Sequence, residues 1–312
     1  MEILQIIIPE RMIDQRIDLA LSEMLPDYSR SKVTAWIKSG DALINKKKFK
    51  PKDKVSGNEM VFLTLTQKDN NYWLPEKIDL NIVYEDDHII VINKPFGLVT
   101  HPGAGNLNGT LANALLYHDS SLSSLDRSGI VHRLDKNTSG LMVVSKNLKS
   151  QKFLVDQMQN HLVEREYSAI VYGYMISGGS INEPIGRDSK DRVRQTISAN
   201  GKEAISHYRV IDRFKSHTHV KVVLETGRTH QIRVHLSHIG HPLIGDPMYG
   251  GRVRFPKKAN TKLKHTLSHF DRHALHSKKL TLDHPATGES MTWKANLPDD
   301  MQVLLSSLKE FD

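Results

Sequence analysis

The chain contains 312 residues without a single cysteine, and it carries a formal net charge of +8 at pH 7. This length corresponds to about two domains, and the lack of cysteine excludes disulfides, thiolate metal sites, iron–sulfur clusters and cysteine nucleophiles. The longest apolar run, for example Ile89–Ile92, spans four residues, whereas a membrane helix needs about 20. No basic segment follows Met1, so we expect no signal peptide, no membrane partner and a cytoplasmic protein.

The positive charge gathers in two segments. Between Gly251 and Lys279 nine basic residues accompany one acid, so this stretch alone carries +8. A second run of lysines lies within Lys46–Lys54. A single lysine run is as often a solvated surface as a binding site. Two runs in one chain favour a phosphate backbone as partner, and a membrane surface is less favoured because neither run lies on a clear amphipathic helix.

Two short helices are predicted near the N-terminus. Apolar residues recur at helical spacing in Arg16–Leu25, and Pro26 ends this helix. The second helix begins near Ser29 or Ser31, both of which are suitable N-caps, and it ends at Gly40.

Strands and basic side chains complete this N-terminal module. Residues 42–44 and 60–63 are apolar and predict strands on either side of the lysine-rich loop. Arg30, Thr34 and Lys38 are spaced by four residues, so they share one face of the second helix. A helix pair with such a face can lie against an RNA backbone.

The order of these features resembles the S4 RNA-binding module. The resemblance rests on Arg16-Ile17-Asp18, Leu21, Pro26-Asp27-Tyr28-Ser29-Arg30-Ser31, Trp36-Ile37, Gly40 and Asn45. Each motif is loose, but their order together is specific, and the alternative is a generic helix-hairpin appendage. The resemblance implies RNA contacts from six basic residues, which are Arg16, Arg30, Lys32, Lys38, Lys47 and Lys48.

We divide the chain into an S4 domain over residues 1–66, a linker over 67–77 and a larger domain over 78–312. The linker is polar and contains Asn70, Asn71 and Pro75, which are residues typical of loops.

The larger domain combines many strands with few helices. Residues 82–84 and 89–92 predict a β-hairpin. Further strands are predicted at 141–144, 167–172, 220–224 and 275–282, and helices at 148–158 and 229–239. The strands do not alternate regularly with helices, which argues against a doubly wound sheet. We therefore expect an α+β fold with a mixed sheet and flanking helices.

Several common ligand sites are excluded by spacing. The glycine-rich run Gly103–Gly109 is one residue too long for the dinucleotide fingerprint and lacks the acid about 20 residues further on, and no Walker A run occurs. Histidines gather at 230, 235, 238 and 241, but no HExxH motif accompanies them, and a helix would place His235 on a different face from the others. We therefore expect neither a metal site nor a nucleotide cofactor.

One polar segment, Gly129–Gly140, stands directly before a buried strand. It contains one carboxylate, Asp135, together with flanking cations and two hydroxyls. On spacing alone, we favour a turn in which Asp135 pairs with Arg133 or Lys136 over a catalytic role for this carboxylate.

The same segment resembles the catalytic signature of the RluA class of RNA pseudouridine synthases, through His132-Arg133-Leu134-Asp135 and Thr138-Ser139-Gly140. Further motifs of this class occur in order on both sides: Asn93–Val99, His101–Gly103, Arg165–Ala169, Gly201–Ala204, Gly227–His235, His241-Pro242, Gly245–Pro247, Tyr249–Gly251 and Arg272–His276. The match covers nearly the whole chain, with the S4 module in front. Ser145 departs from it, since relatives often carry alanine there, but no chemistry depends on this position.

The resemblance implies a mainly antiparallel sheet and the isomerisation of uridine to pseudouridine in RNA, without cofactor or metal. Asp135 would be the catalytic carboxylate, and it stays open whether it attacks the sugar, removes a sugar proton or adds to the uracil. Arg233 would keep Asp135 ionised. Tyr167 would stack on the flipped base, and Arg133 would fill the gap that the base leaves.

The implied substrate is 23S ribosomal RNA at the helix 69 stem-loop, free or in a pre-50S particle, and the enzyme is expected to be a monomer. Three alternatives stay open: a non-catalytic RNA-binding assembly factor, the same reaction on another ribosomal helix or a tRNA, and a metal-dependent nuclease. The first alternative leaves Asp135 without a task. The third needs clustered carboxylates, which the segment around Asp135 lacks.

Overall fold

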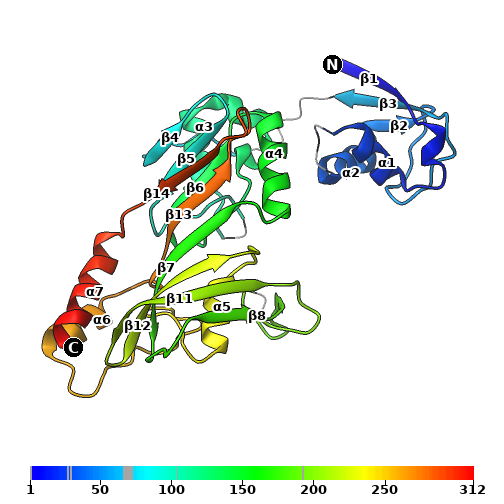
Figure 1. Ribbon diagram of the computed structural model, residues 1–312. Helices are drawn as coiled ribbons and strands as arrows, with labels where there is room; N and C mark the ends of the chain where they lie inside the picture. Colours follow the sequence, from blue (N-terminus) through cyan, green and yellow to red (C-terminus); the bar gives the residue numbers. More distant parts are fainter. Residues whose placement is uncertain (1, 27, 29, 66–72, 104, 192) are drawn as a thin grey trace.

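The computed structural model describes residues 2–26, 28, 30–65, 73–103, 105–191 and 193–312. A small N-terminal module and a larger domain with a long sheet are visible in Figure 1. The boundaries 1–66, 67–77 and 78–312 remain a prediction, because much of the linker lies outside the described residues. The motif residues Asp27, Ser29 and Ala104 also lie outside them.

The N-terminal module packs two helices on a three-stranded sheet. Its elements are β1 (Glu2–Ile7), the 3₁₀ helix η1 (Glu10–Met12), α1 (Ile17–Met24), α2 (Arg30–Ser39), β2 (Ala42–Ile44) and β3 (Met60–Leu65). The antiparallel sheet has the order β1-β3-β2, and Leu21, Val33 and Val61 belong to one buried cluster between the sheet and the helices. The predicted helices and the two predicted strands are confirmed, whereas β1 was not predicted.

The larger domain is built on a nine-stranded sheet of order β4-β5-β6-β13-β7-β12-β11-β8, with β14 added to β13. Its strands are β4 (Ile82–Glu85), β5 (Ile89–Lys94), β6 (Ser139–Ser145), β7 (Glu164–Tyr172), β8 (Gly179–Asn182), β11 (Ile205–Phe214), β12 (His217–Leu224), β13 (Leu275–Asp283) and β14 (Ser290–Lys294). All described pairs are antiparallel except β6 with β13. The predicted α+β fold with a mixed, mainly antiparallel sheet is confirmed.

Helices flank both halves of this sheet. They are α3 (Leu111–His118), α4 (Leu148–Gln159), α5 (Gln231–His238), α6 (Thr261–Ser268) and α7 (Asp299–Phe311), with the 3₁₀ helices η2 (Ser120–Ser124) and η3 (Asp126–Gly129). The separate pair β9 (Ile185–Arg187) and β10 (Gln195–Ile197) lies next to α5. None of the helices in the described ranges is both long and apolar enough to span a bilayer.

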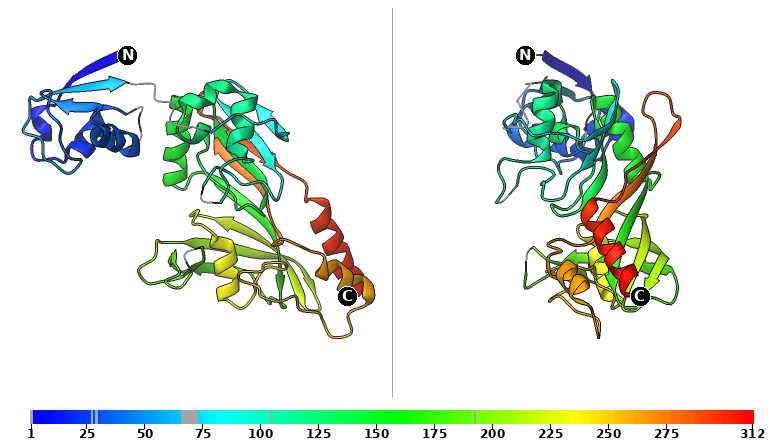
Figure 2. Two further views of the ribbon diagram at one scale, coloured as in Figure 1. Left: turned by 180° about the vertical axis from the view of Figure 1, so that it is seen from behind. Right: turned by 90° about the vertical axis from the view of Figure 1, so that its left-hand side faces the viewer.

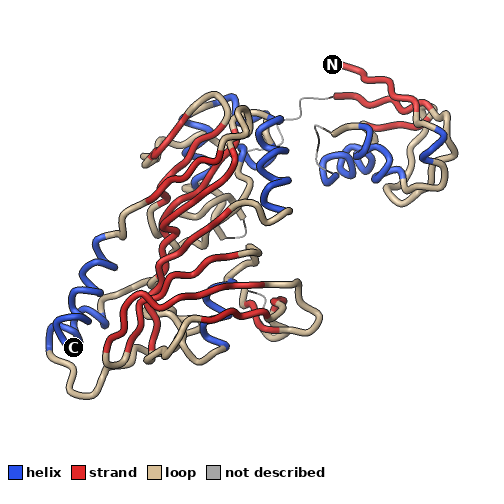
Figure 3. The backbone as a smooth tube through the Cα atoms, in the orientation of Figure 1, coloured by secondary structure: helices blue, strands red, loops and turns tan. Residues whose placement is uncertain are grey.

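The strand β7 connects the two halves of the sheet. In Figure 2, α3 and α4 lie beside the β4–β5–β6 half, and α5 lies beside the β11–β12 half. Figure 3 shows the strands continuing from one half into the other through β7. The loop before β6 and the start of α5 therefore face each other across the middle of the sheet.

Gly140, near the start of β6, permits the close approach of β6 to β13. Its φ is +115°, and a Cβ atom there would lie 2.2 Å from the carbonyl oxygen of Ser277. Gly140 and Ser277 are also partners in the parallel pairing of the two strands. Only glycine fits this position, because the nearest atoms belong to the backbone and cannot turn aside.

We expect Gly140→Ala to lower the free energy of unfolding by more than about 3 kcal/mol, since the added methyl group forces two central strands apart. Gly288→Ala is the matched control. Gly288 also has a positive φ, +71°, but no atom lies within 4 Å of the place that a Cβ atom would take, so the expected loss is about 1 kcal/mol. Urea unfolding of both variants measures the difference, and equal losses would contradict the close-approach argument.

Several histidines are buried within the sheet, and two of them are almost fully enclosed. His217 in β12 and His276 in β13 are each 1% exposed. Burial lowers the pKa of both side chains to about 4, from 6.5 for an exposed histidine. Both imidazoles are therefore neutral in the folded protein at neutral pH.

We expect the free energy of unfolding to fall as the pH is lowered from 6.5 to 4. In this window the unfolded chain binds protons at His217 and His276 that the folded chain does not bind, so the stabilisation that is complete above pH 6.5 is progressively lost. Urea titrations at several pH values measure the slope. His217→Gln should reduce the slope by up to about 1.4 kcal/mol per pH unit, and an unchanged slope would refute this assignment.

Candidate active site

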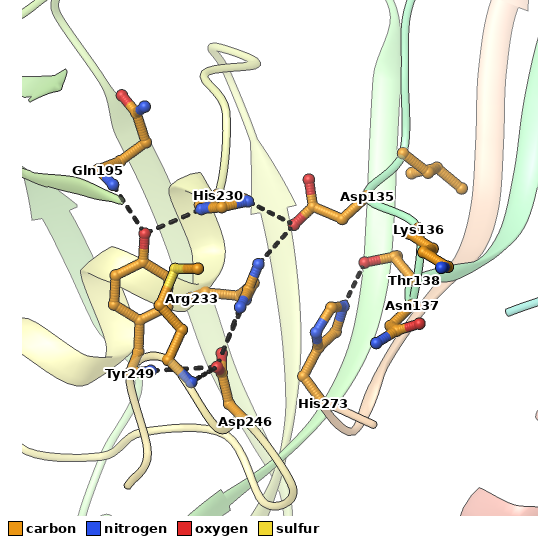
Figure 4. A network of polar contacts seen from close by, with 12 residues as sticks. Asp135, Lys136, Asn137, Thr138, Gln195, His230, Arg233, Asp246, Tyr249 and His273 are labelled. Atoms are coloured by element: carbon orange, nitrogen blue, oxygen red, sulfur yellow. Dashed lines mark hydrogen bonds and ion pairs between the residues drawn. The ribbon is translucent and has the colours of Figure 1, made fainter. Parts of the chain in front are cut away.

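Asp135 lies in the loop between η3 and β6, and its carboxylate faces the start of α5. Its Oδ2 accepts a hydrogen bond from Arg233 Nη1 at 3.1 Å, and His230 Nε2 lies 3.8 Å from the same oxygen (Figure 4). Within the part of the chain that the structure describes, Oδ1 has no hydrogen-bond or ion-pair partner. One oxygen of the carboxylate is thus anchored, while the other stays available.

The surroundings of Asp135 keep its carboxylate ionised. Burial alone would raise the pKa of Asp135, but the electrostatic interactions with His230, with the positively charged Arg233 and with His273 outweigh this effect and lower the pKa. The side chain is 17% exposed, so the charged group sits at the edge of solvent rather than in a closed core. A carboxylate in this state can act as a nucleophile or a base at neutral pH.

Arg233 is fixed by a second carboxylate. Asp246 accepts hydrogen bonds from Arg233 Nε at 2.7 Å and from Nη2 at 3.0 Å. The side chain of Asp246 is fully buried and also accepts the backbone N–H groups of Met248 and Tyr249. Asp246 therefore fixes the guanidinium through Nε and Nη2, and Nη1 is left to donate a hydrogen bond to Asp135.

Hydrogen bonds in the turn before α5 fix the position of the helix start that carries Arg233. Gln231 Oε1 accepts hydrogen bonds from the Thr226 hydroxyl at 2.8 Å and from the backbone N–H of Arg228 at 2.9 Å. His230, the N-cap of α5, has the left-handed backbone conformation with φ 58° and ψ 17°. Such a conformation costs about 1–3 kcal/mol for a residue other than glycine.

Buried contacts hold the loop of Asp135 from behind. The Thr138 hydroxyl lies 2.6 Å from His273 Nε2. Lys94, which is 1% exposed, donates hydrogen bonds to the carbonyl oxygens of Pro95, Leu98 and Lys136. Burial lowers the pKa of Lys94 to about 7. Its three hydrogen bonds hold the loop carbonyls together.

His132 has a structural contact rather than an exposed position in the site. Its Nε2 accepts the backbone N–H of Val143 at 3.0 Å. Burial, with a further contribution from Arg165, lowers the pKa of His132 to about 3. The neutral ring therefore fastens the loop to β6.

A cavity of about 520 Å³ opens beside Asp135. Arg133 and Tyr167 line it together with Asp135, and Arg233 lines a smaller cavity that shares these three residues. Tyr167 is 6% exposed, and burial raises its pKa, so its phenol is neutral. The exposed Arg133 side chain stands at the entrance. The four residues that were predicted for catalysis and substrate binding thus lie around one connected space.

Three further residues at this site had no role in the sequence analysis. Asp246, His230 and His273 all stand in motifs that carry the family resemblance, but each contacts a residue of a different motif, at a separation of 13 residues for Asp246 and 135 residues for His273. No local spacing predicts such contacts. The only signal was their position inside the matching motifs.

The six predicted RNA-binding residues lie on the N-terminal module, away from Asp135. Arg16 and Arg30 both bind the buried carboxylate of Asp18, at 3.0 Å and 2.8 Å, and the contact of Arg30 ties α2 to α1. Lys32 Nζ lies 5.6 Å and 5.7 Å from the ring centres of Tyr28 and Trp36. The remaining three are exposed, and they are Lys38, Lys47 and Lys48.

Two family models and many curated relatives match this chain. The model described as RNA pseudouridylate synthase matches residues 88–238, and the S4 domain model matches residues 15–61. Ribosomal large subunit pseudouridine synthase D of Pseudomonas aeruginosa is 50% identical over 97% of this chain and 95% of its own length. The protein of the same name from Escherichia coli strain K12 is 48% identical over 97% of this chain and 93% of its own.

Solved structures show the same fold in the larger domain. The human protein titled RNA Pseudouridylate Synthase Domain Containing 4 aligns with a TM-score of 0.57 and 27% identity, over 73% of this chain and 93% of its own. The bacterial relatives match this chain over 97% of its length. The chain therefore belongs to the RNA pseudouridylate synthase family.

Proposed function

We propose that this RNA pseudouridine synthase acts on 23S ribosomal RNA, at uridines of the helix 69 stem-loop, with Asp135 as its single catalytic carboxylate. The observation that carries the proposal is the ionised Asp135, which is anchored through Oδ2 to Arg233 and has a free Oδ1 beside a cavity. The ribosomal substrate is supported by the relatives that are named ribosomal large subunit pseudouridine synthase D.

The reaction needs no net input of atoms. The bond between N1 and C1′ breaks, the uracil turns, a bond between C5 and C1′ forms, and the proton lost from C5 is balanced by one gained at N1. Glycoside hydrolases need a second carboxyl group to protonate the leaving group. Uracil leaves as a stabilised anion, so the one carboxylate of Asp135 suffices, as nucleophile or base.

The target base must leave its stack to reach Asp135. Flipping a nucleotide costs a few kcal/mol. In our proposal the ring of Tyr167 stacks on the flipped uracil inside the cavity, while the exposed guanidinium of Arg133 takes the vacated place in the RNA. The position of both residues around the same cavity supports these roles.

A groove between the N-terminal module and the larger domain offers a path for the approach of RNA. The groove has a volume of about 650 Å³ and is lined by Arg30, Lys32 and Lys152 among its cations and by the acids Glu23, Asp126 and Asp156. Arg127 lines both this groove and the cavity beside Asp135. We propose that the S4 domain holds flanking RNA, free or in a pre-50S particle. We propose further that the enzyme acts as a monomer in the cytoplasm.

We expect Asp135→Asn to lower turnover by at least about 10³-fold and to leave RNA affinity within about twofold. The substitution keeps the size of the side chain and removes the charge that the reaction uses. The assay incubates a helix 69 transcript with the enzyme in EDTA and maps pseudouridine by chemical modification and primer extension. Loss of binding together with activity would instead make Asp135 a structural residue.

We expect the double variant Lys47→Ala/Lys48→Ala to bind the same transcript more weakly at every salt concentration. Each lost phosphate contact should reduce the slope of log affinity against log salt by about 0.7–0.9, with kcat unchanged. The matched control is Lys294→Ala/Lys309→Ala, which removes two exposed lysines of the larger domain. An equal effect in the control would mean that net charge, and not the S4 domain, determines binding.

A further inference from the structure

The two oxygens of Asp135 have different surroundings. Arg233 Nη1 and His230 Nε2 both approach Oδ2, at 3.1 Å and 3.8 Å. Figure 4 shows Oδ1 pointing away from both groups. The site therefore distinguishes the two oxygens before any substrate binds.

Arg233 by itself fixes the orientation of the Asp135 carboxylate only weakly. Its Nε and Nη2 are taken by Asp246, and one hydrogen bond remains for Asp135. A carboxylate with a single anchor can turn about its last side-chain bond, because torsions of this kind have broad wells. A second group on Oδ2 is needed to prevent the two oxygens from exchanging places.

The opposite nitrogen of His230 is fixed by Tyr249. Nδ1 lies 2.9 Å from the Tyr249 hydroxyl, and the backbone N–H of Gln195 donates to the same hydroxyl oxygen at 2.9 Å. A backbone N–H can only donate, so the hydroxyl accepts from Gln195 and its own hydrogen is free to reach Nδ1. An imidazole that accepts at Nδ1 carries its proton at Nε2 when it is neutral, and this is the nitrogen that faces Asp135.

The Tyr249 ring is itself held in place. Arg233 and Arg194 lie 4.9 Å and 5.2 Å from its ring centre, within the range of cation–π attraction. The backbone of His230 is left-handed, with φ 58°. Glycine would adopt this conformation without strain, so a histidine here indicates that the side chain has a use.

We propose that His230, oriented by Tyr249, is a positioning residue that directs its Nε2–H at Oδ2 of Asp135 and so leaves Oδ1 as the oxygen that reacts with the uridine. The inference rests on the proposed catalytic role of Asp135. The separation of 3.8 Å is too long for a hydrogen bond in the free enzyme, and such contacts shorten when substrate fills the site.

Two substitutions of His230 separate this role from a structural one. The amide nitrogen of glutamine reaches the place of Nε2, whereas that of asparagine reaches only the place of Nδ1. We expect His230→Asn to lower kcat by about 10- to 100-fold with KM within twofold, and His230→Gln to stay within about fivefold of the wild type. Asparagine tolerates the left-handed backbone better than most residues, so a purely structural role predicts the reverse order.

The variant Tyr249→Phe tests the orientation without altering His230. It keeps the ring beside both arginines and removes the hydroxyl. We expect a severalfold lower kcat and a shift of the His230 ¹⁵N signals from the Nε2–H form towards the Nδ1–H form, with the signal assigned by its loss in His230→Gln. Tyr174→Phe, at a side chain that is 55% exposed, is the control and should change neither.

These measurements distinguish the role of His230 from the catalytic role of Asp135. The helix 69 transcript is the substrate, and thermal unfolding checks that each variant folds. A His230→Asn enzyme with normal kcat, or a His230→Gln enzyme as slow as His230→Asn, overturns the inference. If His230→Asn fails to fold, the ¹⁵N signals in Tyr249→Phe decide, and unchanged signals overturn it. An active Asp135→Asn enzyme overturns the proposed function itself, whatever the His230 variants show.

Discussion

The whole site depends on one arginine that is held between two aspartates. Arg233 gives two N–H groups to the fully buried Asp246 and a third to Asp135. A buried charge without a partner is costly, and removing one member of such a group leaves the others uncompensated. The two carboxylates and the one guanidinium together carry a net negative charge. This charge is least compensated at Oδ1 of Asp135, because that oxygen has no hydrogen-bond partner among the described residues. In the proposed mechanism Asp246 thus holds Arg233 in place and is not itself a reacting group.

Parts of this fold could be predicted from the sequence because their apolar residues follow a simple pattern. The strand β6 is buried along its whole length, so it appears as a continuous apolar run, and α4 repeats its apolar residues at helical spacing. The strand β11 was missed because most of its residues are only partly buried or exposed, which leaves no alternation. The helix α7 was also missed, although Met301, Leu304 and Leu308 are buried at helical spacing.

The site was less predictable than the fold. Spacing alone favoured a simple turn at Asp135, and only the family resemblance reversed this interpretation. Arg233 and Tyr167 were then correctly expected near Asp135, because their motifs match. Asp246 and His230 received no role, since their contacts join different motifs: Asp246 binds Arg233, and His230 faces Asp135. Such contacts depend on the packing of the whole sheet and leave no local pattern.

The parallel pairing of β6 with β13 affects the order in which parts of the protein can fold during synthesis. His276 pairs with Ser139, and His273 contacts Thr138, so the loop of Asp135 is completed by a strand that leaves the ribosome more than 100 residues later. Contacts of such high sequence separation form late. The N-terminal module has its own core and emerges first. The N-terminal module can therefore fold on the nascent chain before β13 completes the surroundings of Asp135.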